Sequence, residues 1–536
     1  MEQPVVPPSG LRADALVVAS VMAAVAAVGV TTTAMGVVAR PLADDIGADA
    51  VQLGWGVNAY LLVAASLALV GARLGDRYGR RRVFGLGCAC FAVGSLVAAL
   101  APGFEVLLAG RVLQGVGAAL LLPSSIEVIA VTLTGGAERR ALLIRGTTFA
   151  VAFGVGPLVG GLLGDTLGWR WVFVVVALLA VVPAVLVLPR STPVVGGEPL
   201  HDPVGAVASV VGVFTVVLVA ERGRAWGGAA AGLIAAGLAV AVVLSFVAYE
   251  RRRAHPLVHP SLLRDRTVAG GDLATFASAL GMLGLLYFFG IYATSAATLE
   301  WSALSLALAL VPFAASLALL GLFAGWLGER LGRAVPVVVG MGLMAFGFLV
   351  LSRSSAETTD AQVVVPLAIC GIGAGIANAC VTRPAVLSVD RHRLGEAAGV
   401  ASLARFAGTA LALAIGTTTY LGVGAHEVAN APDRATASEI SGADSAELVL
   451  GGDAFERALG SLEEDLRAPF RAAVELDTLE GFTRTMRWTG IVIAVSAVVS
   501  GLLLRGRPQE RQSASGATSR GPANGSATAL PDAEEE

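Results

Sequence analysis

The chain has 536 residues, of which 55% are hydrophobic and 14% are charged, and its formal net charge is −3. A soluble chain of this length carries about 25% charged residues, so the composition excludes an ordinary soluble protein and indicates a polytopic membrane protein. The slight acidic balance does not indicate a nucleic-acid partner. The four cysteines all lie within apolar runs, which fits neither a disulfide framework nor a metal site. We expect no metal and no cofactor.

Fourteen apolar runs follow one another along the chain. Spanning a bilayer takes roughly 20 mostly apolar residues, and each run should be helical because lipid offers the backbone no hydrogen-bond partner. The runs are 15–39, 51–71, 83–101, 105–131, 142–165, 169–189, 204–220, 227–249, 268–292, 303–326, 335–352, 363–387, 397–421 and 485–504. The predicted fold class is an all-α integral membrane protein with fourteen transmembrane helices.

The placement of arginine predicts the orientation of these helices. Eighteen arginines, among them Arg139, Arg140 and Arg145, fall in loops on the side that both termini share, and five fall in the short loops on the other side. Basic residues concentrate in cytoplasmic loops, so both termini are predicted to be cytoplasmic in a multi-pass protein of the cytoplasmic membrane. The long loop 422–483 is acidic and predicted to be external. Within it, residues 453–475 are expected to form a helical or partly ordered excursion.

Two short stretches of the chain repeat one pattern. Residues 72–80 read ARLGDRYGR and residues 325–333 read GWLGERLGR, and both follow the second run of a group of six. The repeat predicts two related halves, which is the architecture of secondary transporters. The chain contains no lysine and therefore no Walker A motif, which excludes ATP-driven transport by this chain alone.

These features predict six segments along the chain. They are a cytoplasmic tail (1–14), an N-terminal six-helix bundle (15–190), a linker with two extra transmembrane helices (191–250), a cytoplasmic loop (251–267), a C-terminal six-helix bundle that includes the external loop (268–505) and a disordered cytoplasmic tail (506–536).

Several motifs in a fixed order carry a family resemblance. Residues 72–81 match the pattern G-x-L-a-D-r-x-G-r-k with Ala at its first position, RVLQGVGAALLLP (111–123) matches R-x-x-Q-G, and GVGPLVGGLLGD (154–165) is rich in glycine around a proline. In these motifs the chain resembles the major facilitator superfamily and, within it, the fourteen-span drug:proton antiporter family.

The resemblance implies a function as well as a fold. It implies the major facilitator fold with two six-helix bundles and two linker helices. It also implies a proton-coupled exporter of lipophilic drugs, antibiotics or toxic metabolites that works by alternating access. The expected partners are a small lipophilic substrate, protons and membrane lipid, and the protein is expected to act as a monomer.

The first copy of the repeat predicts a conformational latch. Gly75 and Gly79 permit a tight reversal, and Asp76 can lie near a helix N-terminus, where negative charge is favoured. The resemblance implies that this acid and its arginines latch the two halves on the cytoplasmic side. The predicted latch residues are Asp76, Arg77, Gly79, Arg80, Glu329 and Arg330. The alternative is that these arginines only anchor the topology.

Three ionisable residues within or near the apolar runs are candidates for proton coupling. A buried arginine costs at least about 2.5 kcal/mol at mid-membrane, and the resemblance assigns Arg111 to proton transfer; the alternative is a structural tie between helices. Glu127 is the second candidate, with snorkelling to the membrane surface as its alternative. Asp272 is the third, although its position near the inner end of its run favours a surface location.

The first apolar run departs from the family pattern. Thr32 stands where the family often carries an aspartate that could attract cationic drugs or hold a proton. The difference argues against a cationic multidrug profile and shifts the predicted coupling toward Glu127 or Asp272.

The glycine-rich motif of the fifth run predicts a specialised helix contact. Small residues at intervals of four let another helix approach closely, and proline bends a helix. In the family this motif marks exporters; ordinary glycine packing is the alternative. The residues assigned to the motif are Gly154, Gly156, Pro157, Gly160 and Gly161.

Aromatic and amide side chains within the runs are candidates for a substrate cavity, because apolar pockets with few polar groups suit lipophilic ligands. The candidates are Asn58, Tyr60, Gln114, Phe153, Tyr287, Tyr292 and Asn378. Packing or contact with lipid is the alternative for each of them.

Other functions stay open at this point. The runner-up is a transporter of a lipid or of one self-made metabolite, and a membrane sensor or scaffold that does not transport is a third reading. An enzyme is not expected, because the five histidines form no catalytic constellation.

Overall fold

The computed structural model describes residues 11–48, 50–190, 202–222, 228–253, 256–295, 298–332, 334–355, 357–387, 389, 393–427, 459–460 and 463–505. The described helices, in chain order, are α1 (Leu11–Ile46), α2 (Ala50–Tyr78), α3 (Arg80–Ala99), α4 (Phe104–Thr132), α5 (Gly135–Thr166), α6 (Arg170–Val187), the 3-10 turn η1 (Leu188–Arg190), α7 (Pro203–Arg222), α8 (Gly228–Glu250), α9 (Pro260–Arg264), α10 (Arg266–Thr294), α11 (Ala303–Ala309), α12 (Val311–Leu331), α13 (Ala334–Leu351), α14 (Asp360–Leu387), α15 (Leu394–Glu427) and α19 (Glu464–Leu504).

Among the described residues, eleven helical segments are long and apolar enough to cross a membrane. They are α1 to α6, α10, the stretch Leu304–Phe323 that covers α11 and much of α12, α13, α14 and α19. The other three predicted runs coincide with α7, α8 and α15. The predicted run 303–326 is split at Leu310, after which α12 begins at Val311 with Pro312 in its first turn. Proline is favoured in a first turn because its missing N–H costs nothing there.

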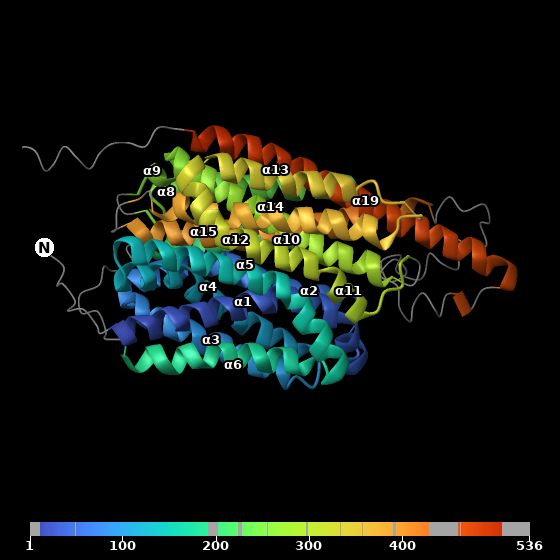
Figure 1. Cartoon of the computed structure of the whole chain (residues 1–536), viewed down its shortest axis with the longest axis horizontal. Coiled ribbons are helices and arrows are strands. Elements are labelled where there is room, and N and C mark those ends of the chain that lie inside the picture. The colour runs from blue at the N-terminus through green and yellow to red at the C-terminus, as the bar shows by residue number, and fades with distance from the viewer. Residues whose placement is uncertain are drawn as a thin grey trace, which may run out of the picture.

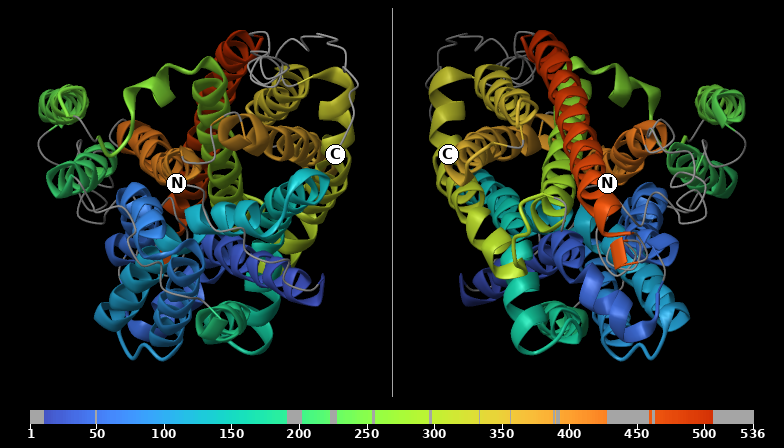
Figure 2. Two further views of the ribbon diagram at one scale, coloured as in Figure 1. Left: turned by 90° about the vertical axis from the view of Figure 1, so that its left-hand side faces the viewer. Right: turned by 90° about the vertical axis from the view of Figure 1, so that its right-hand side faces the viewer.

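The helices form two groups that lie side by side (Figure 1). Helices α1 to α6 pack mainly on one another and are called the first half. Helices α10, α12 to α15 and α19 pack mainly on one another and are called the second half, to which the short α11 also belongs in chain order although it packs mainly on α5. The halves meet where α5 packs on α12 and α14, where α15 packs on α2 and α4, and where α1 packs on α10. Helices α7 and α8 lie at the outside of the bundle, and α7 contacts α2 and α15 (Figure 2).

The two copies of the sequence repeat share a backbone feature. Gly79 separates α2 from α3 with φ of 95°, and Gly332 follows α12 with φ of 77°. These glycines occupy the same position in the two copies, and their left-handed conformation is one that only glycine adopts readily. The internal repeat is therefore a repeat of structure as well as of sequence.

Helix α19 extends the last predicted run by about six turns. The sequence predicted a run over 485–504 preceded by a loop to 483, but α19 begins at Glu464 and continues without a break to Leu504. The extension is helical because it has its own apolar face, on which Phe470, Val474 and Phe482 are buried. Most of the predicted acidic loop, the first residues of the N-terminal tail and the C-terminal tail from 506 lie outside the described residues.

Candidate functional site

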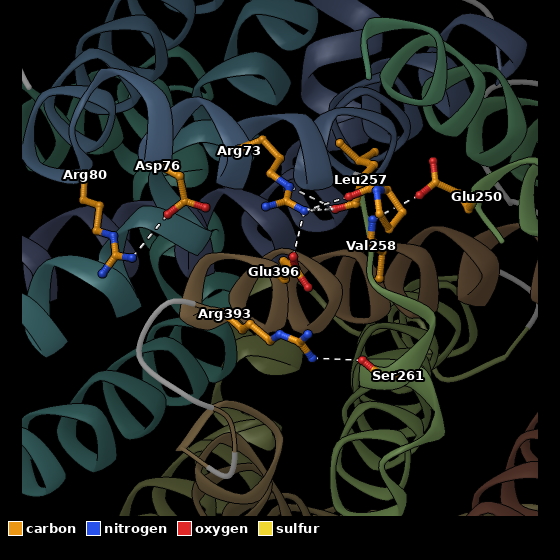
Figure 3. A network of polar contacts seen from close by, with 10 residues as sticks. Arg73, Asp76, Arg80, Glu250, Leu257, Val258, Ser261, Arg393 and Glu396 are labelled. Carbon is orange, nitrogen blue, oxygen red and sulfur yellow. Dashed lines mark hydrogen bonds and ion pairs between the residues drawn. The ribbon is translucent and has the colours of Figure 1, made fainter. Parts of the chain in front are cut away.

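The end of the bundle at which α2 meets α3 is called the arginine-rich end; it lies on the left in Figure 1. Here Arg73 of α2 reaches across to the second half (Figure 3). Its guanidinium donates to Glu396 Oε1 of α15 at 2.8 Å, to the carbonyl oxygen of Leu257 at 2.7 and 2.9 Å and to that of Pro256 at 3.0 Å. One side chain thus ties the first half to the second half and to the segment between α8 and α9.

Asp76 lies against the beginning of α15. A Cβ atom added to Gly395 would come within 2.5 Å of Asp76 Oδ2, so the carboxylate faces the backbone of the first turn of that helix. A negative charge is stabilised at such a position by the helix dipole. Arg80, one turn along the chain, donates to Asp76 Oδ1 at 3.2 Å.

Glu127 of α4 lies behind this contact and is completely buried. Its Oε2 atom is 3.3 Å from Arg80 Nε, and a Cβ atom on Gly75 would lie 3.0 Å from the same oxygen. The predicted alternative, snorkelling to the surface, is therefore wrong, because the carboxylate is enclosed between α2 and α4.

We name Arg73, Asp76, Arg80, Glu127 and Glu396 the latch cluster. The five groups act on one another electrostatically. Three are carboxyl groups and two are guanidinium groups, so the latch cluster is neutral only when one proton is bound. Arg73 and Glu396 were not among the predicted latch residues, because no local sequence pattern pairs two residues that lie in different halves of the chain.

The other predicted latch residues play different parts in the structure. Arg77 lies over the ring of Tyr78 at 5.0 Å, and Arg330 lies over the ring of Trp326 at 4.4 Å. Gly79 provides the turn, and the side chain of Glu329 lies outside the described residues.

Arg111 is enclosed in the first half, with 1% of its side chain exposed. It donates to the carbonyl oxygens of Gly56 at 2.7 Å and Val57 at 3.3 Å and to Gln114 Oε1 at 2.8 Å. Its guanidinium also lies 4.7 Å from the centre of the Tyr60 ring. Carbonyl, amide and aromatic groups therefore solvate this cation, and no carboxylate of the described residues pairs with it.

The hydrogen-bond network around Arg111 continues to α1 and α3. Gln114 donates to Ser95 Oγ at 2.7 Å, and the hydroxyl of Tyr60 lies 3.3 Å from that of Thr32. Thr32 also donates to the carbonyl of Val28. Thr32, which stands where the resembled family often has an acid, thus contributes a neutral hydroxyl next to the Arg111 network.

Asp272 of α10 is buried, with 8% of its surface exposed. The expected surface location is wrong, because the residue lies nearly two turns into α10 and on its packed side. Neither carboxylate oxygen has a hydrogen-bond partner among the described residues. A buried carboxylate without such partners is a group that readily holds a proton.

The glycine-rich motif of α5 brings that helix into close contact with α1. Because Pro157 has no N–H, the carbonyl of Phe153 loses its partner within the helix. The hydroxyl of Thr33 on α1 donates to that carbonyl at 2.7 Å. Thr33 can approach only because residue 156 is glycine: a Cβ atom there would lie 1.9 Å from Thr33 Oγ1. Thr33 was not among the predicted site residues.

The other glycines of the motif face different neighbours. A Cβ atom on Gly160 would lie 2.8 Å from the carbonyl oxygen of Ala34 on α1, whereas one on Gly154 would lie 3.3 Å from Ala314 on α12. Gly161 is buried. The motif therefore serves packing within the first half at Gly156 and Gly160, and contact between the halves at Gly154.

The predicted cavity residues separate into two groups. Tyr60 contacts Phe406 of α15 edge-on, Tyr287 of α10 lies 3.6 Å from where a Cβ of Gly36 on α1 would be, and Phe153 packs on Phe149. These three lie near the boundary between the halves. In contrast, Tyr292 stacks on Phe482 within the second half, Gln114 belongs to the Arg111 network and Asn58 is buried.

Two further cations lie at the boundary between the halves. Arg145 was counted among the loop arginines, but it lies ten residues into α5 and is 5% exposed. Arg405 of α15 stacks on Phe149 of α5, with its guanidinium carbon 4.6 Å from the ring centre, and donates to Asn378 Oδ1 at 3.4 Å. The loop assignment of Arg145 is wrong, because the residue lies inside the apolar run 142–165 and α5 already begins at Gly135.

Comparison with known proteins identifies the family of this arrangement. Residues 19–413 match the Major Facilitator Superfamily. The chain belongs to the major facilitator superfamily. A member of this superfamily is a multi-pass membrane transporter. Within the described residues, no group of three or more His, Cys, Asp or Glu could hold a metal ion.

The chain is similar in sequence to three curated transport and resistance proteins, among others. Multidrug efflux pump LfrA of Mycolicibacterium smegmatis is 30% identical over 68% of this chain and 72% of that protein. The probable actinorhodin transporter of Streptomyces coelicolor is 30% identical over 75% of this chain and 72% of that protein. Puromycin resistance protein pur8 of Streptomyces alboniger is 31% identical over 72% of this chain and 78% of that protein.

A solved structure shares the fold. The proton:xylose symporter XylE bound to 6-bromo-6-deoxy-D-glucose superposes with a TM-score of 0.54 at 12% identity, covering 90% of this chain and 95% of that chain. At this identity the likeness establishes the major facilitator fold alone.

Proposed function

We propose that this protein is a proton-coupled exporter of lipophilic drugs, antibiotics or toxic metabolites across the cytoplasmic membrane. It exchanges protons for substrate by rocking two six-helix bundles, with α7 and α8 as two extra spans in a total of fourteen. It acts as a monomer. The names of its relatives, which include efflux, export and resistance proteins, support the direction and the substrate class.

The observation that carries the proton coupling is the unequal composition of the latch cluster. With the arginine-rich end closed, three carboxyl groups face two guanidinium groups in a partly buried space. Unpaired buried charge is costly, so the closed state favours one bound proton. When the halves separate, Glu396 leaves with the second half, and Asp76 and Glu127 balance Arg73 and Arg80. The proton is then released at the arginine-rich end.

Glu127 is the proposed carrier of this proton, since it is the completely buried carboxyl group of the latch cluster. Arg111 contributes through its charge. Its guanidinium positions the Tyr60 ring, whose hydroxyl contacts that of Thr32, next to the boundary between the halves. Asp272 is a second carboxyl group that could exchange protons within the second half.

We also propose that the arginine-rich end faces the cytoplasm, together with both termini. Tyr78 at this end and Leu167 at the opposite end are both exposed. In intact cells, an impermeant thiol reagent should label Leu167→Cys and leave Tyr78→Cys unlabelled. The reverse pattern would contradict the orientation.

The coupling is tested in proteoliposomes with an imposed pH gradient. Addition of an exported compound should dissipate the gradient in the wild type, as followed with a pH-sensitive dye. Glu127→Gln should bind the compound without moving protons, and Arg81→Gln, which contacts Thr132 within the first half, should behave as the wild type. Transport by the wild type without proton movement would overturn the proposal.

A dedicated exporter of one self-made metabolite is the second candidate function. It is favoured by relatives named as an actinorhodin transporter and a cephamycin export protein. A panel of structurally unrelated compounds separates the two functions, because a dedicated exporter protects cells against one chemical class only.

A further inference from the structure

Arg145 and Arg405 meet at one aromatic ring. Arg145 and Phe149 are one turn apart on α5, so their side chains lie on the same face of that helix. Arg405 of α15 covers the ring of Phe149 from the other half, at 4.6 Å from its centre. The two cations therefore lie near the same point of the boundary between the halves.

The protein leaves much of the hydrogen-bonding capacity of this pair unused. Arg145 donates to Ser125 Oγ at 2.7 Å and to the carbonyl of Leu122 at 3.0 Å, and Arg405 makes one long bond, of 3.4 Å, to Asn378. Each guanidinium has five N–H donors. Within the described part of the chain no carboxylate forms an ion pair with either cation.

Two like charges without a counter-ion are unfavourable inside a membrane protein. Arg145 and Arg405 repel each other. The surrounding protein groups solvate each of them less completely than they solvate Arg111. Such an arrangement provides binding energy for a negatively charged group that enters between the halves.

We propose that the Arg145–Arg405 pair, with Phe149 between its members, binds the carboxylate and the ring of an aromatic anion, so that the substrates of this exporter are lipophilic aromatic carboxylates. The inference rests on the proposed function and narrows its substrate class. Guanidinium groups recognise carboxylates with paired hydrogen bonds. The Phe149 and Phe153 rings, 5.9 Å apart, offer an aromatic surface beside the cations.

The same geometry disfavours cationic compounds and supplies a means of release. A positively charged ligand would be repelled by two like charges, and such repulsion contributes to specificity. Thr32 contributes a neutral hydroxyl and not a carboxylate that could attract a cation. Because Arg145 belongs to the first half and Arg405 to the second, rocking of the halves separates the two cations. The affinity for the anion then falls.

The test measures binding to the purified full-length protein by fluorescence anisotropy of three matched probes: 1-pyrenebutyrate, 1-pyrenebutanol and 1-pyrenebutylammonium. The wild type should bind the carboxylate at least about tenfold more tightly than the alcohol and should bind the ammonium compound most weakly; tenfold corresponds to one well-placed ionic contact. Arg405→Gln should lose this preference while keeping its affinity for the alcohol, and Arg405→Lys should keep part of it.

Arg330→Gln is the matched control, because Arg330 is exposed and stacks on Trp326 at the end of α12. It should retain the wild-type order of affinities. Arg405 makes one long hydrogen bond, so its variants should fold even if Arg145→Gln does not; melting temperatures confirm this. Equal binding of the three probes by the wild type, or an equal loss of all three in Arg405→Gln, would overturn the inference. Coupled transport of neutral compounds by such a protein would leave the proposed function standing.

Discussion

The two ends of the bundle use charge in different ways. At the arginine-rich end, five ionisable groups are partly or fully buried, belong to both halves and are unequal in number. At the opposite end, Arg170 pairs with Asp45 within the first half and Arg471 pairs with Glu300 within the second half, all with exposed side chains. The exposed pairs are balanced and tie helices within a half, whereas the latch cluster ties one half to the other.

Contact between the halves toward the opposite end is apolar. It is made where Gly36 faces Tyr287 and where Gly154 faces Ala314. Closure of the two ends therefore depends on different forces: ion pairs that respond to protons at one end and van der Waals packing at the other. This difference would allow a proton to bias one gate without acting directly on the second.

Arg73→Gln should have the largest effect on this comparison. It removes the ion pair with Glu396 and leaves three acids with one arginine, so the closed state should lose on the order of 2 kcal/mol, or more than tenfold in population. Spin labels at Tyr78→Cys and Leu331→Cys report the opening, since these exposed residues occupy the same position in the two repeat copies. Arg81→Gln, which removes a hydrogen bond to Thr132 within the first half, is the control. An unchanged distance distribution in Arg73→Gln would show that Arg73 does not hold the arginine-rich end closed.

Glu396→Gln should have a smaller effect of a different kind. The variant also loses the pair with Arg73, but it leaves two acids and two arginines. The population of the open state should therefore increase several-fold and should no longer depend on pH between 5.5 and 8.5. A pH response as strong as that of the wild type would show that Glu396 is not part of the proton-binding unit.

Sequence patterns predicted some residues of the latch cluster but not which of its residues pair with one another. The repeat pointed to Asp76, and an acid in an apolar run pointed to Glu127. Arg73 and Glu396 are 323 positions apart, and no local pattern says that α2 and α15 meet. The burial of Asp272 and Arg145 was not predicted, because both lie within the first few residues of an apolar run and the run alone does not reveal which face of the helix is packed. The helical fold itself was predictable, since an apolar run in lipid has few other conformations.

Tyr287→Ala tests the apolar end. Loss of the ring should weaken closure there by on the order of 1–2 kcal/mol, because the contact with α1 is lost. Labels at Leu167→Cys and Leu304→Cys, both exposed, follow the opening. The change should be equal at pH 6 and pH 8, and a strong pH dependence would contradict the apolar description of this end.

Asp45→Asn should have the smallest effect. The hydrogen bond from Arg170 lowers the pKa of Asp45, so the pair stabilises the folded state above the unfolded pKa of an aspartate and loses this contribution as the pH falls through the lower, folded value. Since Asp45 is 46% exposed, the contribution should be well below about 1 kcal/mol. The melting temperature at pH 7 should change by little, and transport should not change.

The proton dependence of the arginine-rich end is tested most directly by the Tyr78–Leu331 distance as a function of pH. In the wild-type background, the short-distance population should be largest at pH 5.5 and should decrease toward pH 8.5, because the closed latch cluster is neutral only with one proton bound. Glu127→Gln removes one acid permanently and should keep the short distance at every pH. A distance that does not depend on pH in the wild type, or a wild-type pH response in Glu127→Gln, would contradict the account.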